Sequence, residues 1–282
     1  MRNYAEAVAT MIREEHPAFY AEVMEIVKMN DETNIGVRVA SKDNPNFAPV
    51  HYIEPFFKCG LSVEECVREI MNNDMSNINV ELADEEKLNW EDIKDYITMR
   101  LVNVEYNKKF LADKVHVELG NGLAVMFDVT KGDFRAAITN TFAENIGCDC
   151  VMLVCASQIS KTGTPVLFDL ADRLFAEEPT NLLEGESVSG SSMFVLTSKD
   201  SGCGASVIYR SGVADKIRKL IGKYYLLPSS VDEWIVVPES ANIPIVELSK
   251  MVSGANKTVV ERNELLSYGV YEWTANGLER VA

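Results

Sequence analysis

Residues 224–238 read YYLLPSSVDEWIVVP and hold two short apolar runs, 224–227 and 234–237. Both runs are rich in the aromatic and β-branched side chains that strands favour. The six residues between them include two serines and two acids. The stretch therefore predicts two strands joined by a short connection, and the first question is whether that connection is structural or functional.

The connection is interpreted first as a helix cap. Pro228 ends the first strand, and Ser230 with Glu233 has the spacing of a capping box, in which each side chain bonds the other residue's amide and closes one helical turn. The same amides, beside the hydroxyls of Ser229 and Ser230, can hold a small anion. The carboxylates of Asp232 and Glu233 oppose an anion. Ser229, Ser230, Asp232 and Glu233 are thus candidate ligand-binding residues, with the structural interpretation preferred.

The first 80 residues predict a small αβββα unit. Apolar residues at helical spacing predict a helix over residues 4–15. Strand-like runs follow at 21–29, 34–40 and 49–57, separated by turn-rich segments. Ser62 and Glu65 form a capping box that opens a second helix. Residues 81–282 are expected to form a larger α+β domain.

In this larger domain, Asn89 is expected to cap a helix that runs through Ile97. Ser211 is expected to cap a further helix, and Pro244 to start another. The strands are expected at 115–118, 123–129, 134–139, 193–197 and 205–209, with a terminal pair that turns at Asn276-Gly277. The fold class is therefore α+β, with mixed, mainly antiparallel sheets and flanking helices on one face.

The composition is acidic, with 43 acidic and 27 basic residues and a net charge of −16. Such a charge repels phosphate backbones and anionic membranes, so we expect neither direct nucleic-acid binding nor membrane association. No signal-like or membrane-spanning run is present in the sequence, which predicts a cytoplasmic protein. Free buried thiols are expected for the six cysteines, including Cys148, Cys150 and Cys155.

The motifs predict no metal and no cofactor. The CDC run at 148–150 lacks the paired spacing of a structural zinc site. The run SKTGTP at 160–165 has Ser160 where a phosphorylation loop needs an aspartate nucleophile, and it is typical of a turn. No nucleophile elbow, dinucleotide turn or phosphate-binding loop occurs. The sequence does not decide whether His16, His51, His116 or scattered acids meet in a cleft.

Three motifs carry a resemblance: the stretch at 226–238, RLVNVEYNKKFL at 100–111 and APVHYIEPFF at 48–57. Together they resemble an uncharacterised bacterial family, a domain of unknown function of anaerobic Gram-positive bacteria and their mobile elements. In that family's pattern a histidine usually stands at the position of Asp232, so this position is not a universal catalytic base. The resemblance implies a bacterial, cytoplasmic setting and transfers no site.

The function expected from these observations is that of a non-enzymatic binding or regulatory protein with a protein or small-molecule partner. Two alternatives stay open. One is a carboxylate-dependent hydrolase that uses Asp232 and Glu233. The other is an acidic nucleic-acid mimic that binds a basic protein through residues 81–95, the most acidic stretch. Enzymatic activity and oligomeric state are left open.

Overall fold

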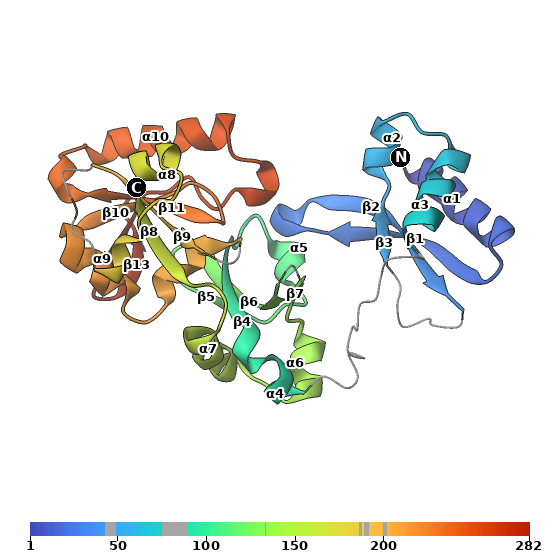
Figure 1. Cartoon of the computed structure of the whole chain (residues 1–282), viewed down its shortest axis with the longest axis horizontal. Coiled ribbons are helices and arrows are strands. Elements are labelled where there is room, and N and C mark those ends of the chain that lie inside the picture. Colours follow the sequence, from blue (N-terminus) through green and yellow to red (C-terminus); the bar gives the residue numbers. More distant parts are fainter. Residues whose placement is uncertain (43–48, 75–88, 133, 186–187, 189–191, 200–201) are drawn as a thin grey trace. The chain divides into compact units, whose positions relative to one another are not determined.

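The computed structural model describes residues 1–42, 49–74, 89–132, 134–185, 188, 192–199 and 202–282. Its helices and antiparallel sheets belong to two compact units, Met1–Leu88 (unit 1) and Asn89–Ala282 (unit 2), which are seen in Figure 1. The predicted α+β class is confirmed. The predicted boundary at residue 80 lies outside the described residues and stays a prediction.

Unit 1 is a three-stranded antiparallel sheet, in the order β1-β2-β3, against which helices pack. Its elements are α1 (Arg2–Glu15), β1 (Phe19–Val27), η1 (Met29–Asp31), β2 (Thr33–Ser41), β3 (Val50–Tyr52), α2 (Glu54–Lys58) and α3 (Val63–Asp74). α1 contacts β1, β2 and α3, and its apolar face forms the centre of the core. The capping box of α3 is confirmed, since Ser62 N donates to Glu65 Oε2 at 2.8 Å and Glu65 N donates to Ser62 Oγ at 3.2 Å.

The third strand of unit 1 is shorter than predicted. The prediction extended it over residues 49–57, but β3 ends at Tyr52 and Glu54–Lys58 is the helix α2. Pro55 stands in the first turn of α2, where a missing backbone N–H leaves no hydrogen bond unmade. The carboxylate of Glu54 is favoured at the same helix start. The described unit is therefore αβββαα.

Unit 2 begins with a four-stranded sheet in which β6 pairs with β4, β5 and β7. Its elements are α4 (Trp90–Ile93), η2 (Lys94–Tyr96), β4 (Ile97–Asn103), α5 (Lys108–Leu111), β5 (His116–Glu118), β6 (Leu123–Lys131), β7 (Phe134–Ala137), α6 (Asn140–Ile146) and α7 (Cys150–Ile159). Asn89 caps α4 as predicted. The helix does not run through Ile97, because residues 97–103, ITMRLVN, favour a strand.

A six-stranded antiparallel sheet, in the order β13-β12-β10-β11-β9-β8, forms the rest of unit 2. Its elements are β8 (Pro165–Asp169), α8 (Leu170–Phe175), η3 (Leu182–Glu184), β9 (Phe194–Ser198), η4 (Gly204–Tyr209), α9 (Val213–Ile221), β10 (Tyr224–Pro228), β11 (Glu233–Pro238), η5 (Glu239–Ala241), α10 (Ile245–Thr258), η6 (Arg262–Glu264), β12 (Tyr271–Thr274) and β13 (Gly277–Arg280). The helix after Pro244 and the terminal strand pair are confirmed.

Helices cover both faces of this sheet, and the prediction of helices on one face is wrong. Leu227 of β10 packs with Leu248 of α10. Tyr224, which points to the opposite face of β10, donates its hydroxyl to Ala214 O of α9 at 3.3 Å. Figure 1 shows α10 and α9 on opposite sides of these strands. Because successive side chains of β10 alternate between the faces and are apolar on both, each face needs its own cover.

Two further predictions in unit 2 are wrong. Residues 205–209 were expected as a strand but form most of the 3₁₀ helix η4. The indole Nε1 of Trp234 donates to Ala205 O at 2.6 Å. In a strand, this carbonyl would instead accept a hydrogen bond from a neighbouring strand. The expected cap at Ser211 is absent, since Gly212 is the N-cap of α9 and makes no side-chain cap bond.

Candidate functional site

The four predicted ligand-binding residues lie in the hairpin that joins β10 to β11. Pro228 pairs with Trp234 in an antiparallel register, so the chain reverses over residues 229–233. The predicted helical turn is wrong, because Ser230 Oγ accepts from Asp232 N at 3.0 Å and not from Glu233 N. Glu233 O accepts from Ser229 N at 3.3 Å and from Ser230 N at 3.4 Å, so the Ser230 amide proposed for an anion is already bonded within the loop. Ligand binding by this loop stays a prediction.

Asp232 differs from the other three loop residues because its side chain reaches a second segment. Asp232 Oδ1 accepts from the backbone N–H of Cys203, which lies just before η4. Its backbone carbonyl accepts from Thr197 Oγ1 of β9 at 2.7 Å. Asp232 therefore fixes the hairpin to the turn between β9 and η4.

That turn has the sequence Gly202-Cys203-Gly204 and is tightly packed. Cys203 adopts a left-handed backbone with φ of 66°, which is uncommon for a residue with a side chain. A Cβ on Gly204 would collide with Ser198 N and Asp232 O, both of which are backbone atoms. Only glycine fits at position 204, so the turn's close approach to the hairpin depends on it.

Two arginines from the four-stranded sheet reach the same place. Arg135 of β7 donates from Nη1 to Cys203 Sγ at 3.1 Å and from Nη2 to Gly202 O at 3.0 Å. Arg100 of β4 forms an ion pair with Asp128 of β6, with Nη2 and Oδ2 2.7 Å apart. We call Arg100, Asp128, Arg135, Cys203 and Asp232 the Cys203 cluster. The cluster joins the two sheets of unit 2. The formal charges of its two arginines and two aspartates are balanced.

The electrostatics of this cluster favour a protonated thiol. Burial raises the pKa of Cys203, and the nearby carboxylates of Asp128 and Asp232 oppose the effect of the two arginines. A buried thiol with a raised pKa is a poor nucleophile, because the thiolate is the reactive form. Among the buried side-chain atoms of the described residues, Asp128 Oδ1 and Arg135 Nε have no hydrogen-bond partner. The arrangement is suited to holding the two sheets together more than to thiol chemistry.

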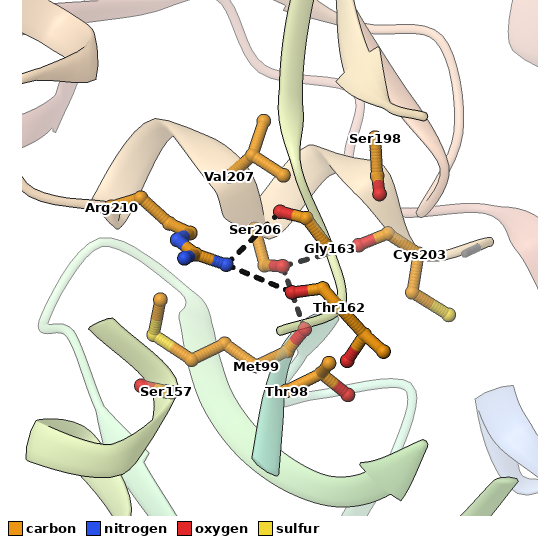
Figure 2. A pocket seen from close by; sticks show the side chains of 10 residues that line it. All are labelled: Thr98, Met99, Ser157, Thr162, Gly163, Ser198, Cys203, Ser206, Val207 and Arg210. Atoms are coloured by element: carbon orange, nitrogen blue, oxygen red, sulfur yellow. Dashed lines mark hydrogen bonds between the residues drawn. The ribbon is translucent and has the colours of Figure 1, made fainter. Parts of the chain in front are cut away.

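A small polar pocket adjoins the cluster (Figure 2). Cys203 and Ser206 line one side, where Ser206 Oγ donates to Met99 O at 2.6 Å. Arg210 also lines the pocket, on the other side of Ser206 from Cys203 in Figure 2. It donates to Thr162 O at 2.9 Å and to Ser160 O at 3.2 Å. The pocket has room for about one water molecule, well below the size of a cavity that encloses an organic substrate.

The second candidate feature is a surface on α7. Leu153, Ala156 and Ser157 are buried on the inner side of this helix. On its outer side Val151, Val154 and Ile159 are 69%, 39% and 79% exposed, and Cys155 is exposed as well. Positions 151, 154, 155 and 159 follow one face of a helix. We call these four residues the α7 stripe. The expectation that Cys155 is a buried thiol is wrong, and the same holds for Cys59.

No charged residue occurs within α7, whose sequence is CVMLVCASQI. A helix that is apolar on both sides is normally covered on both sides. Within the described residues, no helix taken singly has both the length and the apolar character that a membrane span requires. The pair α6 and α7 meets that requirement by length and composition only when taken together, and it is bent by 86°.

Sequence reasoning found Asp232 but missed the rest of the Cys203 cluster and the whole α7 stripe, although each feature left a signal. Arg100 and Asp128 are the charged residues of otherwise apolar or uncharged strand segments, ITMRLVN and LAVMFDV. Cys203 stands between two glycines, a pattern that indicates a constrained turn. For α7, the absence of any charge over ten residues is the signal. His16 and His51 lie in unit 1 and His116 in unit 2.

The chain belongs to a family of unknown function, DUF5688, whose model matches residues 1–275. No curated protein and no solved structure matches the chain. The resemblance to an uncharacterised family is thus confirmed, and the family supplies no activity. In the part of the chain that the structure describes, no group of three or more His, Cys, Asp or Glu side chains could hold a metal ion.

Proposed function

We propose that this protein is a non-enzymatic binding or regulatory protein, cytoplasmic and of a bacterium or mobile element, whose partner is a protein that docks on the α7 stripe. One observation carries the proposal: α7 has a second apolar face, with Val151 and Ile159 exposed by more than two thirds. Contiguous exposed apolar side chains on a helix are typical of docking surfaces. Covering them with a partner removes their apolar area from water.

The test is affinity capture from the native cell with three forms of the full chain. Ile159→Lys places a charge at the end of the stripe, and Lys is favoured at a helix carboxyl end, so the fold is preserved. Val259→Lys is the matched control, since Val259 stands at the carboxyl end of α10 and is 80% exposed against 79% for Ile159. We expect a captured protein that is lost with Ile159→Lys and kept with Val259→Lys. Equal capture by all three forms would refute the proposal.

A carboxylate-dependent hydrolase is the second candidate, and one observation favours it. Burial raises the pKa of Glu264, and the nearby carboxylates of Asp232 and Glu261 raise it further. A carboxyl with a raised pKa is suited to general acid catalysis. A hydrolase screen with and without magnesium, repeated with Glu264→Gln and Asp232→Asn, tests this candidate. Turnover that survives repurification and disappears in one of these variants would replace the binding proposal.

A further inference from the structure

We infer that the start of α7 is a redox switch, in which Cys148 and Cys150 form a disulfide that removes the helix cap and weakens docking on the α7 stripe. The inference rests on the proposed function and names the regulation of that surface. The two cysteines are separated by one residue, Asp149, which is the N-cap of α7. Val151, the first residue of the stripe, follows directly. A bond at this corner therefore forms next to the docking surface.

The backbone at Asp149 places the two thiols on one side of the chain. Asp149 has φ of −117° and ψ of 175°, which is an extended conformation. Side chains two positions apart in an extended chain point in the same direction. The exposure follows this pattern, because Cys148 and Cys150 are free and half-buried whereas Asp149 between them is exposed.

A disulfide between these thiols requires the chain to shorten. An extended residue keeps the Cα atoms on either side of it about 6.6–7.2 Å apart, whereas a disulfide usually joins Cα atoms about 5.5–6 Å apart. Asp149 must therefore leave its extended conformation when the bond forms. Asp149 Oδ1 accepts from Met152 N at 2.8 Å, and a cap of this kind needs an extended cap residue. Oxidation thus releases the Met152 amide and loosens the first turn of α7.

The reaction is thiol–disulfide exchange with a small-molecule disulfide such as oxidised glutathione. Burial raises the pKa of Cys148, and the neighbouring Asp149 and Cys150 raise it further, so Cys150 reacts first. The thiolate of Cys150 attacks one sulfur of the reagent, and the other sulfur leaves as a thiolate. The thiolate of Cys148 then attacks Cys150 Sγ and releases the second thiolate. The two protein thiols lose two electrons and two protons, and the reagent becomes two thiols.

The bond is suited to reversible regulation. A disulfide that closes only when the backbone moves is more easily reduced than one that fits the fold. In reducing compartments such as the proposed cytoplasm, disulfides mostly serve as transient redox sensors. We therefore expect the bond to form under oxidising conditions and to open when thiols are added.

Bond formation is tested with oxidised glutathione on the full chain carrying Cys155→Ala, so that no adduct forms on the stripe itself. Mass spectrometry is expected to show that the peptide with Cys148 and Cys150 has lost two hydrogen atoms. Cys148→Ser in the same background is the control, and it should instead keep a glutathione adduct on Cys150. A parent chain that retains both thiols, or that carries only adducts, would overturn the inference.

The effect on α7 is tested by hydrogen exchange of the Met152 amide. We expect exchange at least about fivefold faster in the oxidised chain, because the loss of an N-cap frees this amide, and recovery after dithiothreitol. Cys150→Ser treated in the same way should stay within about twofold of the untreated chain. Unchanged exchange in a chain whose disulfide has formed would overturn the coupling to the helix.

Native capture separates this inference from the proposed function. The protein whose capture depends on Ile159 should be captured by the reduced chain and by treated Cys150→Ser, and lost with the oxidised chain. Capture that depends on Ile159 but not on oxidation would overturn the inference and leave the docking surface in place. Equal capture by Ile159→Lys would refute the proposed function and the regulation of docking with it, whereas the mass and exchange measurements still decide the disulfide and its effect on Met152.

Discussion

Gly204 stands at a position where the fold cannot accept a side chain. A Cβ at this position would meet the backbone of two other segments, at Ser198 and at Asp232, and neither atom belongs to a flexible side-chain end. The restriction arises from packing, since the conflict involves neighbouring atoms of β9 and of the hairpin. The turn before η4 therefore requires glycine at position 204, because the space there fits only the hydrogen atom of a glycine Cα.

We predict that Gly204→Ala lowers the free energy of unfolding by roughly 1–3 kcal/mol or more, the usual range for overpacking a well-filled interior. Gly254→Ala is the matched control, because Gly254 lies inside α10, where an added Cβ would meet no atom within 4 Å beyond the helix's own backbone. That control should raise stability by about 0.5–1 kcal/mol through helix propensity. Urea unfolding measures both, and equal effects would contradict the packing argument.

The cysteines are predicted to differ in their reactivity toward iodoacetamide. Cys59 and Cys155 are exposed and should react first, whereas Cys66 and Cys203 are buried with raised pKa values and should react last. Peptide mass mapping over time gives the order. Early labelling of Cys203 in folded protein would contradict the prediction, and labelling in urea shows that every thiol can react.

The same raised pKa gives a sign for the pH dependence. The folded chain retains the Cys203 proton at pH values where the unfolded chain loses it, so the unfolded state binds fewer protons. The contribution of Cys203 to stability is therefore complete below about pH 8.5, the ordinary thiol pKa, and is lost as the pH rises above it. Cys203→Ala should flatten this part of the stability profile.

Among the elements, α7 depends on an arginine from another segment. The guanidinium of Arg210 donates to the carbonyls of Gln158, Ser160, Thr162 and Gly163, at the end of the helix and in the turn after it. The last carbonyls of a helix have no partner within the helix. Arg210 supplies partners for them, and burial lowers its pKa without a carboxylate partner in these bonds.

We predict that Arg210→Ala lowers the free energy of unfolding by about 1.5–3 kcal/mol, the range for hydrogen bonds to a charged group. Arg210→Lys should recover part of the loss, because one ammonium cannot reach four carbonyls in the geometry of a guanidinium. Lys219→Ala, at an exposed position of α9, is the control and should change little. A loss in Arg210→Ala no larger than in this control would contradict the capping role.

The elements also show what a sequence can predict. The two strands at 224–228 and 233–238, the capping box at Ser62 and the strand turn at Gly277 depend on residues a few positions apart, and all are confirmed. The Cys203 cluster depends on contacts between residues 29 and 68 positions apart, as in Cys203–Asp232 and Arg135–Cys203. Local propensity contains no information on such pairs.

The predicted helical turn in the hairpin failed for a related reason. Ser230 and Glu233 have capping-box spacing, but the strands on either side pair with each other in an antiparallel register. The chain therefore has to reverse its direction over residues 229–233. Backbone pairing over a whole strand outweighs one side-chain cap. The candidate site was therefore predicted in part, since Asp232 belongs to the Cys203 cluster, whereas the other three residues are used by the loop itself.

At the scale of the whole molecule, the two units have separate apolar cores. In unit 1, Ile12 is fully buried among residues of α1, the sheet and α3. In unit 2, Leu248 is fully buried between α10 and the six-stranded sheet. A domain with its own core is able to unfold as its own cooperative unit.

We predict that calorimetry resolves two unfolding transitions, and that a core variant shifts the transition of its own unit. Ile12→Ala and Leu248→Ala each remove a buried aliphatic side chain, which typically costs about 2–5 kcal/mol. Because the truncated contacts lie within one core, Ile12→Ala should lower the midpoint of one transition and Leu248→Ala that of the other. A single transition that both variants shift equally would show that the units unfold together, and would reject the division near residue 80 as a boundary between independently stable domains.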